Sequence, residues 1–202
     1  MAKDKQTYKY RQEESIVAST IDEYTLSEHQ YYLLYAFFVT YSLCGTQSHK
    51  KRTLTEYGWL AESFTDSGLK IELEKTLKLN TNKHFCFTEE NDLGYRFREH
   101  DLQNGPLTNI DIERAVVSRT HGDNKYLKLF YRIRDGFAHG SFSLRLNTSG
   151  EKMVVIQDQD QFNVTARIVL KLDTLLQFVH TIDRNHLLCP QQTADSNNKE
   201  VA

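Results

Sequence analysis

The chain contains little proline, and this shortage argues against a disordered protein. Only two of its 202 residues are proline, while 39% are hydrophobic, a composition typical of a regular globular fold. A chain of this length buries roughly two-thirds of its unfolded surface, so it needs no disulfide or metal to fold. We expect a single domain over residues 1–189 and a disordered polar tail at 190–202.

Cysteine is equally scarce, and its spacing argues against a metal site. Cys44, Cys86 and Cys189 lie far apart and form no Cys-x-x-Cys pair, which disfavours both a disulfide framework and a zinc ribbon. His84 lies close to Cys86, but two candidate ligands do not make a site. The sequence also lacks a Gly-rich phosphate loop and a Gly-x-Ser-x-Gly elbow. We therefore expect no metal and no cofactor.

Long apolar segments are absent too. The longest run, residues 31–44, is too short to span a membrane and is interrupted by tyrosines and a threonine, so it predicts a buried helix. The first residues are charged and lack the apolar stretch of a secretory signal. We expect a cytoplasmic protein without membrane contact.

No charge of one sign dominates, because the net charge is −2. The distribution is uneven, however, and one segment, here named the basic window, covers residues 114–134. It contains a single acidic residue, Asp123, and six basic ones: Arg114, Arg119, Lys125, Lys128, Arg132 and Arg134. Such a run indicates either a solvated helix face or a phosphate-binding surface, and charge alone does not separate the two.

Apolar spacing and punctuating residues predict mainly helices. Ser27 and Gln30 have the spacing of a capping box at the start of a helix over 28–44. Thr108 predicts the start of another helix, which has Asp111 and Glu113 in its first turn and ends near Gly122. Residues 80–107 lack a helical period, and we expect a short hairpin or an ordered loop there. Further helices are expected at 54–64, 69–79, 124–138 and from about 172, with a β-hairpin near 141–157.

The segment YRIRDGFAHGSF, residues 131–142, combines charged and glycine residues at the end of an apolar helix. Asp135 and His139 are four residues apart, so they share one helix face, where a carboxylate can orient an imidazole. Arg134 is rotated from His139 by roughly 140° on a continuous helix, so the two side chains cannot lie side by side. Gly136 and Gly140 allow the backbone to leave the helix, and a second copy related by two-fold symmetry is the other way to bring them together.

This segment resembles the Arg-x4-6-His motif of the HEPN superfamily, in which a polar residue follows the arginine and glycine often follows the histidine. Residues 152–182 resemble the C-terminal part of HEPN proteins found on plasmids and mobile elements. The resemblance implies a mainly α fold, a HEPN-like helical bundle with a small β-hairpin insertion near 141–157 before the last helix. It also implies a homodimer whose two motifs form one composite active site.

Many HEPN proteins are metal-independent endoribonucleases of toxin or defence type, so the resemblance implies the same activity here. Arg134, Asp135 and His139 are the implied catalytic residues, with Arg119, Lys125, Lys128 and Arg132 expected to bind RNA. An antitoxin or another regulatory partner is a further expectation. Asp135 departs from the asparagine frequent in the family, and its carboxylate repels phosphate. Position 142 is phenylalanine rather than the tyrosine that some HEPN toxins have modified by a partner nucleotidyltransferase, so that partnership is not expected.

Two alternatives stay open at this point. The first is a HEPN module without catalysis that binds a nucleotide or another protein. The second is a purely structural motif, in which Arg134 pairs with an acidic residue and His139 caps the C-terminus of its helix.

Overall fold

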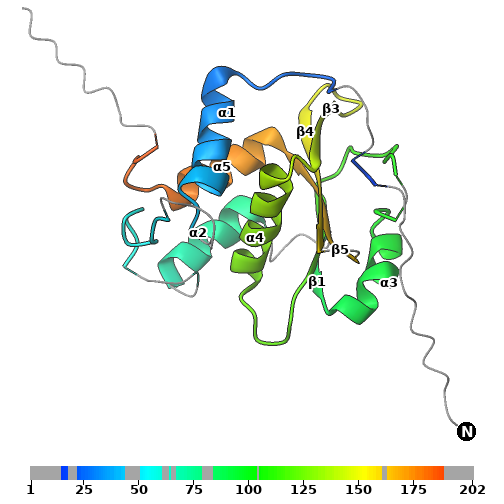
Figure 1. Cartoon of the computed structure of the whole chain (residues 1–202), viewed down its shortest axis with the longest axis horizontal. Coiled ribbons are helices and arrows are strands. Elements are labelled where there is room, and N and C mark those ends of the chain that lie inside the picture. The colour runs from blue at the N-terminus through cyan, green and yellow to red at the C-terminus, as the bar shows by residue number, and fades with distance from the viewer. Residues whose placement is uncertain are drawn as a thin grey trace, which may run out of the picture.

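The structure is a computed structural model of the chain, and it describes residues 15–17, 22–43, 51–60, 64, 67–78, 84–103, 105–160 and 163–188 (Figure 1). The predicted tail at 190–202, and Cys44 and Cys189, lie outside the described residues.

A mixed sheet forms the centre of the molecule. Within the described residues its strand order is β1-β2-β5-β4-β3. β1 and β2 are parallel, and the other neighbouring pairs are antiparallel. The strands are β1 (Phe85–Thr88), β2 (Arg114–Ser118), β3 (Phe142–Leu146), β4 (Lys152–Asp160) and β5 (Asn163–Lys171).

Helices cover the sheet on both faces, in unequal amounts. Figure 1 shows α1, α2, α4 and α5 on one side and α3 on the other. The helical elements are α1 (Glu28–Tyr35), the π-helix η1 (Ala36–Thr40), α2 (Ser67–Leu77), the 3₁₀ helix η2 (Glu90–Asp92), α3 (Leu93–Glu99), α4 (Lys125–Ala138) and α5 (Leu172–Ile182).

The alternating directions of the side chains along the central strands explain why helices cover both faces of the sheet. In β4, Val154 and Ile156 pack into the larger core beneath α4 and α5, while Met153 and Val155 pack into a smaller core with α3. Successive side chains of a strand point to opposite faces, so a strand between two covered faces is a continuous apolar run.

The expectation of a mainly α fold with a small hairpin insertion is wrong. The expected hairpin exists as β3 and β4, but β4 and β5 pair along their length to form the middle of a five-stranded α/β sheet. A fold class depends on long-range strand pairing, which local helical periodicity does not report.

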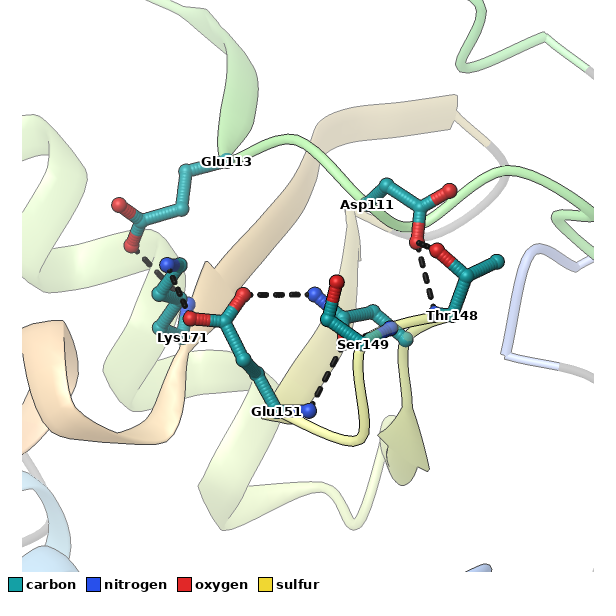
Figure 2. A network of polar contacts seen from close by, with 7 residues as sticks. Asp111, Glu113, Thr148, Ser149, Glu151 and Lys171 are labelled. Atoms are coloured by element: carbon teal, nitrogen blue, oxygen red, sulfur yellow. Dashed lines mark hydrogen bonds and ion pairs between the residues drawn. The ribbon is translucent and has the colours of Figure 1, made fainter.

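The helix predicted from Thr108 to about Gly122 is also wrong, because this stretch contains β2. Its buried residues Val116 and Val117 lie between β1 and β5. Asp111 and Glu113 are not in a first helical turn. Asp111 accepts hydrogen bonds from Thr148, and Glu113 accepts one from the backbone N–H of Lys171 (Figure 2).

Other local predictions have mixed outcomes. Both hydrogen bonds of the Ser27–Gln30 capping box are present, although the helix continues from residue 36 as the π-helix η1. Residues 54–58 form a turn rather than the start of a helix. The described part of residues 80–107 contains β1, η2 and α3, and β1 pairs in parallel with β2 rather than in a hairpin.

Candidate functional site

The motif lies at the C-terminal end of α4, a helix with clear local determinants. The Asn124 Oδ1 atom caps it by accepting hydrogen bonds from the N–H groups of Tyr126 (3.0 Å) and Leu127 (3.1 Å). The predicted apolar stripe is confirmed, and its members are all buried: Tyr126, Leu129, Phe130, Ile133 and Phe137. This stripe attaches α4 to the sheet and so positions the helix end.

A glycine turn ends α4 immediately after His139. Gly140 has φ +64°, its N–H donates to the Phe137 carbonyl (3.2 Å), and the Ser141 N–H donates to the Gly136 carbonyl (2.8 Å). These two bonds are the Schellman arrangement that satisfies the last carbonyls of a helix. His139 is therefore the C-cap residue, and its side chain is exposed.

Gly136 has a different role from the one its sequence position indicates. It lies inside α4 and does not let the backbone leave the helix. A Cβ atom at this position would lie 2.2 Å from Cγ2 of Ile156, so the missing side chain allows α4 to approach β4 closely.

His139 and Asp135 line one groove of about 620 Å³. The groove lies between the end of α4, residues 15 and 17, and the last part of β4. Its lining residues are Ser15, Val17, Asp135, His139, Gly140, Ser141, Gln157, Asp158, Gln159 and Asp160. The predicted placement of Asp135 and His139 on one side of the helix is thus observed as a shared groove wall.

Arg134 does not line this groove. Its guanidinium forms an ion pair with the carboxylate of Asp135, and the two side chains are 18% and 25% exposed. The Arg134 Nε atom is buried without a hydrogen-bond partner among the described residues. An arginine paired with an acidic neighbour and a histidine at the C-cap are the contacts that the purely structural interpretation expects.

Each predicted RNA-binding residue has a partner within the chain. Arg119 donates to the Asp123 carbonyl (3.1 Å), and Lys128 forms an ion pair with the Asp123 carboxylate at 3.0 Å. The backbone N–H of Thr120, and then Lys128, hold the pKa of Asp123 below its ordinary value. Lys125 forms an ion pair with Glu74 (Nζ to Oε1, 3.6 Å), and Arg132 forms one with Asp158 (Nη1 to Oδ2, 2.8 Å). None of the four lines the groove.

The residues missed by sequence reasoning come from the end of β4. Asp158 is 4% exposed, and its Oδ2 atom accepts hydrogen bonds from Arg132 (2.8 Å) and Thr165 (2.5 Å). Gln157, Gln159 and Asp160 complete this wall of the groove. The available signal was the run QDQD at 157–160, which follows an apolar strand and changes abruptly to polar residues.

Comparison with protein-family models, curated proteins and solved structures finds no match to this chain. Within the described ranges, no group of three or more His, Cys, Asp or Glu residues is arranged to hold a metal ion. The described helices also include none that is both long and apolar enough to cross a lipid bilayer.

Proposed function

We propose that the chain is a metal-independent endoribonuclease and that the groove beside His139 is its active site. The observation that carries this proposal is the position of His139, exposed at the end of α4 and sharing a groove with Asp135. An imidazole can take up and return a proton during a reaction, and the Asp135 carboxylate lines the same groove. The pair suits general acid–base chemistry on an RNA strand at the groove.

The reaction is an internal transfer at the ribose. His139 removes the proton of a ribose 2′-hydroxyl, and the 2′-oxygen forms a bond to the adjacent phosphorus. The bond from phosphorus to the 5′-oxygen breaks, and that oxygen receives a proton from a second acid. The products are a 2′,3′-cyclic phosphate and a 5′-hydroxyl.

Arg134 and a second copy of the chain complete the proposed machinery. The guanidinium of Arg134 leaves its ion pair with Asp135 and binds the phosphate instead. There it stabilises the negative charge that develops on the phosphate oxygens. A homodimer supplies a second His139 as the acid. The exposure of Ala138, His139 and Gly140 at the helix end supports this arrangement, because it leaves the motif accessible to another chain. The toxin or defence role, the regulatory partner and the cytoplasmic location are part of the same proposal.

One observation favours a second function, a HEPN-like binding module without catalysis. The cations that RNA would use are engaged with acidic groups or carbonyls of the same chain, and Arg134 is held by Asp135. These contacts reduce the positive potential available to phosphate.

The test uses labelled RNA of varied sequence in EDTA, with end-group analysis of the products. We expect wild type to leave 2′,3′-cyclic phosphates, and His139→Ala and Arg134→Ala each to lower the rate by about a hundredfold or more. His180→Ala and Arg98→Ala, at exposed positions on α5 and α3, are matched controls that retain activity. No cleavage by wild type, or equal cleavage by the motif variants, contradicts the proposal and favours the binding module.

A further inference from the structure

The groove lies where β4 extends beyond its neighbour. β3 begins at Phe142, opposite Ile156, and the Gln157 N–H donates to the Ser141 carbonyl (3.1 Å), so residues 158–160 of β4 pair with β5 on one side and with no residue of β3 on the other. The pairing with β5 shifts register between Asp158 and Gln159. Successive side chains of β4 point to opposite faces, so residues 157–160 reach one groove around the edge of the strand.

The scissile phosphate of the proposed reaction lies beside His139, because charge disfavours a phosphate at the β4 wall of this groove. The groove contains three carboxylates, of which Asp135 is paired with Arg134 and Asp158 with Arg132. Asp160 is exposed, and within the described residues no cation or donor pairs with its side chain. A phosphate group would be repelled here, whereas a ligand edge that presents N–H groups would be attracted.

A buried amide on the same wall of the groove offers a hydrogen-bond donor, and so requires an acceptor from the ligand. Gln157 is 3% exposed, and its Oε1 atom accepts a hydrogen bond from the Ile16 backbone N–H (3.2 Å). This contact identifies Oε1 as the acceptor, so Nε2 is the remaining donor. Nε2 has no acceptor within the described part of the chain, and the side chain lines the groove. A ligand that fits both residues therefore needs an acceptor beside its donors.

We propose that the groove binds guanine and makes the nuclease prefer RNA with guanosine at the cleavage site. The guanine N1–H and N2–H groups donate to the Asp160 carboxylate, and O6 accepts from the Gln157 amide. Adenine and cytosine offer a carboxylate only one exocyclic amine on this edge, and uracil only one ring N–H. This inference rests on the proposed function, and it adds Asp160 and Gln157 as specificity residues.

The test uses four DNA oligonucleotides that each contain one ribonucleotide, either G, A, C or U, at the same position. Only that residue has a 2′-hydroxyl, so the cut site is known. We expect wild type to cut the guanosine substrate at least tenfold faster than the others. Asp160→Asn should slow cleavage of the guanosine substrate and so reduce that preference. The matched control is Asp173→Asn, because Asp173 lies in α5 beyond the opposite end of β5 from Asp160. Cleavage with equal rates for all four bases overturns the inference and leaves the proposed function standing.

A binding measurement separates the two proposals if no substrate is cut. Isothermal titration calorimetry with the four nucleoside 3′-monophosphates reports base preference without chemistry. Tightest binding of 3′-GMP, weakened about tenfold or more in Asp160→Asn, supports the guanine site even where the nuclease proposal has failed. Equal binding of the four nucleotides, or no binding, overturns it.

Discussion

Two glycines four residues apart at the end of α4 show how one residue type meets two different requirements. Gly136 is buried, and its missing side chain leaves the space that α4 needs to pack on β4, since a Cβ atom there would lie 2.2 Å from Cγ2 of Ile156. Gly140 has open surroundings, with nothing within 4 Å of a Cβ atom, and what it provides is a backbone with φ +64°. Both glycines place His139, one through packing and the other through the turn.

Substitutions at these positions should separate the two roles. Gly136→Ala should lower the free energy of unfolding by about 1–3 kcal/mol through overpacking, and its combination with Ile156→Ala should cost less than the sum of the two single changes, because the shorter side chain leaves room for the added Cβ. Gly140→Ala should cost about 1 kcal/mol from the positive φ, and Gly140→Asn less, because asparagine tolerates this region. Urea denaturation measures these variants and Ile156→Ala alone. Equal losses in Gly136→Ala and Gly140→Asn would contradict the distinction.

Among the elements, the β3–β4 hairpin is held by polar contacts at its turn as well as by strand pairing. Figure 2 shows Thr148 directed to Asp111 and Glu151 directed to Lys171. The hydrogen bonds from Thr148 lower the pKa of Asp111, and those from Lys171 and then Asn147 lower the pKa of Glu151. The bond to Glu151 raises the pKa of Lys171. The turn is thus tied to the segment before β2 and to the end of β5.

These shifts predict how the hairpin responds to pH. A carboxylate with a lowered folded pKa stabilises the fold above its unfolded value, and this contribution is lost as the pH falls through the folded value. The ordinary values are 3.8 for Asp111 and 4.5 for Glu151, so the loss occurs below this range. Asp111→Asn and Glu151→Gln should therefore be less stable than wild type at pH 7, with a difference that shrinks towards pH 3.

Urea denaturation at several pH values measures this dependence. Glu89→Gln, at an exposed position between β1 and η2, follows the edge strand at the opposite side of the sheet from β3; it is the control and should follow wild type throughout. A constant difference between the hairpin variants and wild type across the pH range would show that the two carboxylates do not act through their charge.

On the scale of the whole molecule, charge is compensated locally rather than gathered on one surface. The net charge is −2, and two of the acidic partners of the basic window come from distant elements. Glu74 of α2 faces Lys125, and Asp158 of β4 faces Arg132. Sequence proximity predicts a patch of free cations, whereas the fold brings a distant carboxylate to Lys125 and to Arg132.

This compensation predicts weak RNA binding, with an affinity that depends only moderately on salt concentration. The slope of log Kd against log salt should be about 2 or less, equivalent to roughly three phosphate contacts. The double variant Glu74→Gln with Asp123→Asn frees Lys125 and Lys128 and should increase that slope by about 1. Fluorescence anisotropy with labelled RNA, at salt concentrations from about 50 to about 300 mM, measures the slopes of wild type and of the double variant. A steep wild-type slope would indicate a phosphate-binding surface after all.

Local determinants were predicted well where neighbouring residues make the contacts. The Ser27–Gln30 capping box and the buried stripe from Tyr126 to Phe137 follow from spacing alone, because both partners lie within a few residues. The segment from 108 to 122 was mistaken for a helix because acidic residues near its start fit a first helical turn. Their actual partners, Thr148 and Lys171, lie far along the chain.

The sequence by itself determined α4, its cap, its glycine ending and the shared side of Asp135 and His139, because periodicity and hydrogen bonds within one helix depend on adjacent residues. The tertiary structure alone decided that these residues border a groove, that Gly136 meets Ile156 and that QDQD supplies the facing wall. It also decided that the cations of the basic window are paired. Strand pairing and side-chain contacts between distant segments set these features, and their free energy comes from burial that no local pattern encodes.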